Sequence, residues 1–192
     1  ALLQLVLKKN IKILNNISVK DISETTSHAK IKTNLFEMDT SKVFVATNGF
    51  ASQLLNENVQ PARAQVLITK PIENLSIKGT FHLDKGYYYF RNIDNRILLG
   101  GGRNLDFKGE ETTDLNQSTL TQNKLEELLR TIILPNTPLE IDHRWSGIMG
   151  IGNTKNPVVK QLGNHMFCGV RLGGMGVAIG SLIGKDLAGL LD

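Results

Sequence analysis

The sequence is poor in the residues that mark several common classes of protein. It has a single cysteine, Cys168, which excludes an internal disulfide and favours a reducing compartment. No cation neighbours this cysteine in the apolar run HMFCGV, so a buried structural thiol is favoured over a nucleophile. No apolar run reaches the roughly 18 to 20 residues that span a membrane, and the start, ALLQLVLKKN, has no signal-peptide pattern. We therefore expect a cytoplasmic protein with no membrane partner.

An excess of charge of one sign is also lacking. The 22 basic and 18 acidic side chains leave a formal charge of only +4, and the lysines and arginines are scattered. Nucleic-acid binding needs a basic stripe, so we expect no nucleic-acid partner. His143 and His165 have no second ligand at the spacing of a metal site, so no metal is expected. The sequence shows neither a triad nor paired carboxylates, and we assign no catalytic residue.

What the sequence does contain is a β-rich pattern with a few helices. Alternating or apolar runs predict strands at residues 11–16, 17–24, 29–38, 42–47, 62–70, 79–84, 87–91, 96–102, 138–151 and 165–170. Helical patterns cover residues 2–7, 50–58, 120–134 and 177–191. In the third helix the apolar positions that share one face are Leu125, Leu128, Leu129, Ile132 and Ile133.

The order of these elements predicts an α+β fold with two parts. From Pro61 onward the strands follow one another through turns such as DKG and NIDN, which is typical of an antiparallel sheet. The earlier order of helix, strands and a short apolar strand suggests the back half of an α/β layer. The opening helix has neither an initiator methionine nor an N-cap before it, so we expect that the chain was cut from a longer protein.

A glycine-rich stretch, GVRLGGMGVAIG, precedes the last helix. Its residues Gly174, Gly176 and Gly180 have the spacing of a dinucleotide-binding turn. A complete Rossmann domain is excluded, because that fold needs a further strand and an acidic residue, and only twelve residues follow. The turn can still bring free N–H groups and a helix N-terminus to an electron-rich ligand. An equally weighted alternative is that the glycines only allow a helix and a strand to pack closely.

Five motifs occur in a particular order along the chain: ATNG, PARAQVLIT, the hairpin YYYFR–NIDN–RILLGGG, HRWSGIMG, and the glycine turn that enters a helix. In this order they resemble the C-terminal part of the D-amino acid oxidase superfamily of FAD-dependent oxidoreductases. That superfamily includes glycine oxidase, sarcosine oxidase and gamma-glutamylputrescine oxidase. The resemblance covers nearly the whole chain, and each motif alone is weak.

The resemblance implies a division into two domains. Residues 1–49, completed by 167–192, would be the remnant of an α/β FAD-binding domain, and residues 50–166 would form the antiparallel substrate domain. The partner would be the missing N-terminal FAD-binding half of the same chain. The cofactor implied for the full-length protein is FAD, and we expect this fragment alone to hold no FAD and to be inactive.

The resemblance also implies roles for individual residues around the cofactor. Val19 matches a position that holds the adenine through backbone contacts. The turn that passes the diphosphate and ribityl chain corresponds to Ala46, Thr47, Asn48 and Gly49, with Asn48 departing from the family pattern. The turn whose amides face the pyrimidine edge of the flavin corresponds to Gly173, Gly174, Met175, Gly176 and Val177.

Substrate residues follow from the same resemblance. The hairpin and the HRWSGIMG strand would wall the reactive face of the flavin, and their candidates are Tyr87, Tyr89, Arg144, Trp145 and Met149. Tyr87 and Tyr89 share one face of a strand, and we prefer them as the pair that faces the site. For any single residue of the YYYF run, packing within the sheet is the more common role of an aromatic side chain. Arg171 is a further candidate, with a surface ion pair as the favoured alternative.

Met149 stands where amino-acid oxidases of the family have an arginine that pairs with the substrate carboxylate. A thioether cannot bind a carboxylate, so WSGIMG looks more like the amine-oxidising, gamma-glutamylputrescine oxidase-like branch. The resemblance therefore implies oxidation of a small-molecule amine or amino acid by hydride transfer to the flavin, with dioxygen as the acceptor. The alternative from another class is a non-catalytic, β-rich binding or interaction domain.

Overall fold

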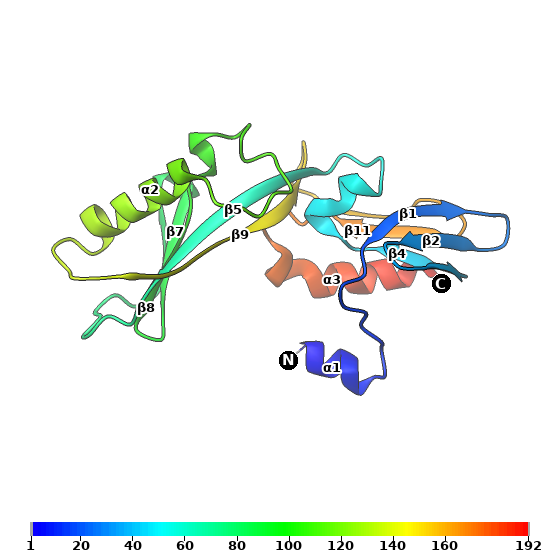
Figure 1. The fold of residues 1–192 in the computed structure, drawn as a ribbon, viewed down its shortest axis with the longest axis horizontal. Helices are drawn as coiled ribbons and strands as arrows, with labels where there is room; N and C mark the ends of the chain where they lie inside the picture. The colour runs from blue at the N-terminus through cyan, green and yellow to red at the C-terminus, as the bar shows by residue number, and fades with distance from the viewer. Residues whose placement is uncertain (1, 192) are drawn as a thin grey trace.

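The computed structural model describes residues 2–191 and has an α+β fold of two lobes (Figure 1). One lobe is built on a five-stranded sheet covered by the helix α2. The other contains the first strands of the chain together with the last strands and the last helix, and two long strands, β5 and β9, run from one lobe towards the other (Figure 1).

The five-stranded sheet has the order β6-β7-β8-β5-β9, and every neighbouring pair is antiparallel. Its strands are β5 (Gln60–Thr69), β6 (Thr80–Leu83), β7 (Tyr88–Ile93), β8 (Arg96–Gly101) and β9 (Ile141–Ile151). The hairpin between β7 and β8 turns at Asp94 and Asn95, which have φ angles of 48° and 56°. Two left-handed residues are typical of the tight turn that matches the twist of a β-hairpin. The sequence predicted this sheet strand by strand.

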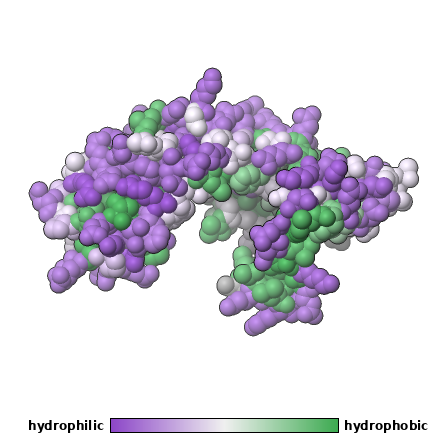
Figure 2. Space-filling view, viewed as in Figure 1, coloured by the Kyte–Doolittle hydropathy of each residue, from purple (hydrophilic) through white to green (hydrophobic). Residues whose placement is uncertain are grey.

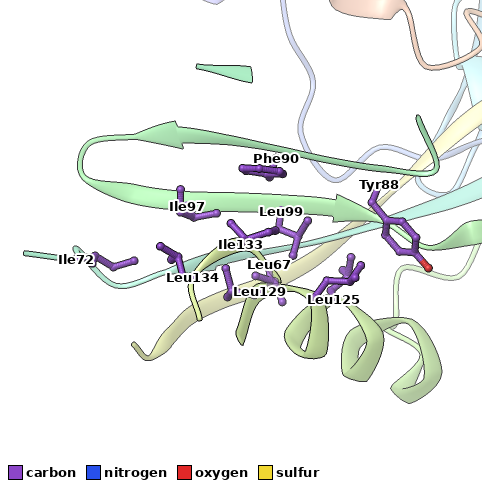
Figure 3. Packing of buried hydrophobic residues seen from close by; sticks show 11 residues of the cluster. Leu67, Ile72, Tyr88, Phe90, Ile97, Leu99, Leu125, Leu129, Ile133 and Leu134 are labelled. Atoms are coloured by element: carbon purple, nitrogen blue, oxygen red, sulfur yellow. The ribbon is translucent and has the colours of Figure 1, made fainter. Parts of the chain in front are cut away.

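One face of this sheet packs against α2 (Thr119–Leu128), which continues as a π-helical turn over Leu129–Ile133. The side chain of Ser118 caps the helix by accepting from the N–H of Thr121. The core between helix and sheet is a cluster of apolar side chains, most of which Figure 3 shows: Leu67, Ile72, Tyr88, Phe90, Ile97, Leu99, Leu125, Leu128, Leu129, Ile133 and Leu134. Ile132 is exposed, so it does not share the buried face expected for it.

A buried ion pair ties the long loop between β8 and α2 to the sheet. The guanidinium of Arg63 donates to both carboxylate oxygens of Glu110, at 2.7 and 3.1 Å. The amide of Gln65 donates to the same carboxylate at 2.7 Å, and Arg63 also donates to the carbonyl of Asn116. These contacts hold residues 102–118 against the sheet.

The other lobe has two small sheets. The first is an antiparallel meander of β1 (Val19–Glu24), β2 (Ala29–Thr33) and β3 (Glu37–Thr40). The second has the order β10-β11-β4, with β10 at Val158–Gln161, β11 at Met166–Val170 and β4 at Val43–Val45. β4 and β11 are parallel although they lie far apart in the sequence, so this sheet joins the two ends of the chain.

Helices and short 3-10 turns complete the molecule. α1 (Leu2–Lys8) lies near the N-terminus, and α3 (Gly176–Ala188) packs along the second small sheet (Figure 1). The 3-10 turns are η1 (Asn48–Gln53), η2 (Asp84–Gly86), η3 (Arg103–Leu105) and η5 (Gly189–Leu191).

Three sequence expectations about secondary structure were wrong, and one strand was not predicted. Residues 11–16 are not a strand, and the run 29–38 is two strands separated by a turn that the hydroxyl of Thr33 closes by hydrogen bonds. Residues 50–58 contain only the end of η1 in place of a full helix. The strand β10 was not predicted, and it pairs with β11 in the second small sheet.

Candidate functional site

The glycine turn lies between β11 and α3. Gly173 and Gly174 have φ angles of 57° and 82°, in the left-handed region that only glycine adopts without strain. The N–H of Gly173 donates to the carbonyl of Gly150 on β9, at 2.9 Å. A Cβ on Gly174 would lie 3.2 Å from the sulfur of Met149. The turn is therefore held against the end of β9, directly beside Met149.

The ATNG turn meets the glycine turn at the same place. Asn48 has a φ of 47°, and its side-chain oxygen accepts from the N–H of Leu172 at 3.0 Å. A Cβ on Gly49 would come within 2.8 Å of the carbonyl oxygens of Ile148 and Met149. Only glycine allows this approach. These contacts place the ATNG turn and the glycine turn, which the resemblance connects with a cofactor, side by side against β9.

The start of α3 is open to a ligand. No side chain caps the helix. The N–H of Ala178 donates to the carbonyl of Met175, which leaves the N–H groups of Gly176 and Val177 without a backbone acceptor in the described part of the chain. Met175 and Val177 are exposed, and Val177 is fully so. Figure 2 shows further apolar residues on the surface of this lobe, over α1. Val19, the third expected cofactor region, is the exposed first residue of β1.

The face of the five-stranded sheet opposite α2 carries a hollow of about 260 Å³. Met149 lies on β9, whereas Tyr89 lies on β7 and Tyr87 just before it. The eight lining residues are Ala64, Gly86, Tyr87, Tyr89, Gly101, Arg103, Phe107 and Met149. The hollow thus brings together three of the expected substrate residues, and Met149 connects it to the glycine turn.

Glycine makes room for Tyr89 in this hollow. A Cβ on Gly100, the cross-strand partner of Tyr89, would lie 2.6 Å from the tyrosine hydroxyl and 2.5 Å from Val66. The Tyr89 ring therefore covers the position that a side chain at residue 100 would occupy. Burial raises the pKa of the Tyr89 phenol, so the hydroxyl stays protonated at neutral pH. Tyr88 and Phe90 point the other way, into the core under α2 (Figure 3).

Trp145 and Arg144 do not line this hollow. Trp145 is 41% exposed and faces a larger hollow of about 630 Å³ farther along the sheet, which Arg144 also borders. The guanidinium of Arg144 donates to Gln122 at 2.8 Å and to the carboxylate of Glu126, both on α2. Burial opposes ionisation of Glu126, but hydrogen bonds from Arg130 and Arg144 outweigh it and lower the pKa of the carboxyl. Arg144 is therefore a structural link between β9 and α2.

Arg171 is also engaged by the protein. Its guanidinium donates to the carbonyls of Asn156 and Asn58, at 2.9 and 3.0 Å, and to the hydroxyl of Thr154. The partners are carbonyls and a hydroxyl, so among the described residues Arg171 does not form the surface ion pair expected as the alternative. The side chain instead ties two loops together beyond the glycine turn.

Sequence reasoning did not single out five of the eight lining residues, and the charged one among them is Arg103. Gly101 and Gly102 have φ angles of 122° and 82°, and the N–H of Gly102 donates to the carbonyl of Tyr87 at 3.0 Å. These glycines turn the chain sharply at the end of β8, so the next residue borders the hollow. The signal that could have found it is a charged residue directly after three glycines at the end of a strand.

No group of three or more histidine, cysteine, aspartate or glutamate side chains within residues 2–191 could hold a metal ion. None of the helices in the described range is long and apolar enough to cross a membrane.

Comparison with known proteins gives a family and a fold. The model of the family described as "DAO: FAD dependent oxidoreductase" matches residues 1–190. No curated protein matches the chain.

Several solved structures are similar in fold. Iminodiacetate oxidase from Chelativorans sp. BNC1 has a TM-score of 0.79 at 18% identity, with 97% of this chain and 52% of that chain covered. L-proline dehydrogenase from P. horikoshii has a TM-score of 0.76 at 22% identity, covering 97% and 52%. Glycine oxidase from Bacillus cereus has a TM-score of 0.75 at 16% identity, covering 93% and 50%. The chain thus spans about half the length of these structures, and at such identities the likeness shows the fold alone.

Proposed function

The chain belongs to the DAO family of FAD-dependent oxidoreductases, and on this premise we propose that it supplies the flavin-facing and substrate-binding half of an amine oxidase. The observation that carries the proposal is the meeting of two turns at the end of β9. The ATNG turn and the glycine turn are joined by the hydrogen bond from Leu172 to Asn48, and the glycine turn is joined to β9 through Gly150.

The residues at this junction fit FAD. The open N-terminus of α3 offers N–H groups and a partial positive charge, which suit the electron-rich pyrimidine edge of a flavin. Residues 173–177 would face that edge, residues 46–49 would pass the ribityl chain and diphosphate, and Val19 would contact the adenine. The chemistry supplied by FAD, when bound, is acceptance of a hydride from the amine-bearing carbon, with dioxygen taking the electrons afterwards.

The chain's own residues would orient the substrate and exclude water. Tyr87 and Tyr89 wall the hollow that begins at Met149 and the glycine turn. A substrate α-carboxylate beside the thioether of Met149 would be desolvated without a partner, which costs several kcal/mol. We therefore propose an amine without a neighbouring carboxylate as the substrate, as in the gamma-glutamylputrescine oxidase-like branch.

The test is an oxidation assay on the protein that contains this chain together with an N-terminal FAD-binding half. Peroxide release would be measured with glycine, sarcosine, D-alanine and gamma-glutamylputrescine as substrates. We expect the last to be oxidised faster than the small amino acids. Faster oxidation of a small free amino acid would contradict the substrate class, and a colourless protein with no activity would favour a non-catalytic binding domain.

A matched pair of variants separates the site from general damage. Gly174→Ala adds a Cβ at a left-handed position 3.2 Å from the sulfur of Met149, whereas Gly184→Ala adds one within α3 with open space around it. We expect Gly174→Ala to lower flavin occupancy or turnover and Gly184→Ala to leave both unchanged. Equal effects of the two variants would count against a flavin at this turn.

The chain by itself would hold FAD weakly or not at all, because the residues proposed here contact only part of the cofactor. Titration of the isolated chain with FAD, followed by ultrafiltration, would measure this directly. A yellow, stoichiometric complex would contradict the proposal. The buried thiol of Cys168 fits a reducing compartment, which supports our proposal of a cytoplasmic location.

A further inference from the structure

Arg103 stands apart from the other residues of the hollow defined by Tyr87, Tyr89 and Met149. Among the eight residues that line this hollow, all within the described range, only Arg103 carries a charge. Its guanidinium lies over the ring of Phe107, with 4.7 Å between the guanidinium carbon and the ring centroid. The ring covers one face of the guanidinium and leaves its N–H edge for another partner.

The protein offers that edge no anion within residues 2–191. The ion pairs of the described residues use other arginines, including Arg63, Arg96 and Arg130. The two arginines considered from the sequence, Arg144 and Arg171, are engaged by α2 and by loop carbonyls. A half-buried guanidinium that lacks a counter-ion favours an anionic ligand, because its charge is already partly withdrawn from water.

The position of Arg103 determines where the anionic group of that ligand lies relative to the glycine turn. The glycine turn contacts β9 at Met149 and Gly150, and Arg103 follows the end of β8. Strand β5 lies between β9 and β8, so their backbones are separated by two strand spacings, roughly 10 Å. The Arg103 guanidinium lies over Phe107, whose ring contacts Tyr87 just before β7. An anionic group at Arg103 would therefore lie on the β7–β8 side of the hollow, across β5 from Met149 and the glycine turn.

We propose that Arg103 binds a carboxylate of the substrate that is separated by several bonds from the amine-bearing carbon. This proposal rests on the proposed function, and it adds Arg103 to the residues that recognise the substrate in the same site. It is consistent with Met149, which leaves no partner for a carboxylate next to the reacting carbon. Arg103 is thus a specificity-determining residue, and the substrate class is an amine with a remote carboxylate.

Binding of a carboxylate that cannot be oxidised tests this step independently of activity. The flavin-loaded protein would be titrated with valerate and with the neutral analogue valeramide by isothermal titration calorimetry. We expect valerate to bind more tightly than valeramide, and Arg103→Gln to weaken valerate binding roughly 10-fold to 100-fold without affecting valeramide. Arg103→Lys should retain part of the affinity, since it keeps the charge and loses the planar donor edge.

Arg91 supplies the matched control. It lies on β7, is exposed and does not border the hollow, so Arg91→Gln removes the same charge from the same sheet. Arg91→Gln should leave the valerate affinity unchanged. The proposal is overturned if valerate does not bind the parent protein, or if the Arg103 and Arg91 variants bind it alike.

Turnover separates this inference from the proposed function. With δ-aminovalerate and its amide as paired substrates, the parent protein should prefer the acid in kcat/KM, and Arg103→Gln should abolish that preference. Oxidation of both at equal rates in all variants would sink the inference while leaving amine oxidation intact. Oxidation of neither would count against the proposed function, and the valerate titration would still decide the role of Arg103.

Discussion

Removal of the Glu110 carboxylate should destabilise the protein far more than removal of an exposed carboxylate. Glu110 is 2% exposed and Arg63 is 8% exposed, and the two form a bidentate pair to which Gln65 adds a third hydrogen bond. Glu110→Ala would leave the guanidinium buried without its counter-ion, which costs about 3–5 kcal/mol in the free energy of unfolding. Denaturant unfolding of the parent protein and the variant, monitored by circular dichroism, measures this difference.

Glu140→Ala is the matched control, because Glu140 also pairs with a cation, Lys70, but on the surface. Its removal should change the free energy of unfolding little. The reasoning would be refuted if the Glu110 and Glu140 variants lost the same stability. Because the pair holds residues 102–118 against the sheet, Glu110→Ala should also loosen the loop that carries Arg103. The pair therefore affects the hollow as well as the stability of the protein.

The same ion pair predicts a pH dependence. Burial opposes ionisation of Glu110, but the hydrogen bonds from Arg63 and Gln65 outweigh it and lower the pKa of the carboxyl. Because the pKa is lower in the folded state than in the unfolded state, the contribution to stability is complete above the unfolded value of about 4.3. It is lost as the pH falls through the folded value. The stability difference between the parent protein and Glu110→Ala should therefore shrink in acid, and a difference independent of pH would argue against the pair.

Three other changes have expected outcomes. Gly49→Ala places a Cβ 2.8 Å from the carbonyl oxygens of Ile148 and Met149, and should lower the free energy of unfolding by about 1–3 kcal/mol in the same denaturant assay. Leu125→Ala removes part of a fully buried side chain under α2 and should lower the free energy of unfolding by about 2–5 kcal/mol. A loss as small as that of a surface substitution would contradict the burial of Leu125. Burial raises the pKa of the Cys168 thiol, so a thiol reagent should react with it slowly until denaturant is added, whereas rapid labelling of the folded protein would contradict its burial.

Much of the fold could be predicted from sequence because its strands alternate strongly and its turns carry clear signals. The hairpin of β7 and β8 is an example, with Asp94 and Asn95 at the turn and Tyr88 and Phe90 on the buried face. Residues 11–16 were wrongly predicted as a strand because Ile11, Ile13 and Leu14 have strand-like spacing, yet these side chains are exposed. Apolar spacing predicts a strand only where another surface covers it.

The candidate site was predictable only in part. The glycine turn and the ATNG turn carry local signals, since positive φ angles and close approaches require glycine or asparagine. Which arginine borders the hollow depends on tertiary structure. Arg144 and Arg171 were the natural candidates in sequence, but α2 and the loop carbonyls engage them, whereas Arg103 reaches the hollow because glycines turn the chain there.

We propose that the junction of the two turns faces a flavin that oxidises an amine. The most direct measurement is the visible absorbance of the flavin in the protein that joins this chain to an FAD-binding half, followed after anaerobic mixing with gamma-glutamylputrescine. We expect about one flavin per protein and bleaching of its absorbance by the amine. Gly174→Ala should lose one or both, and Gly184→Ala should lose neither. A protein that binds no flavin, or whose flavin is bleached equally well in both variants, would contradict it.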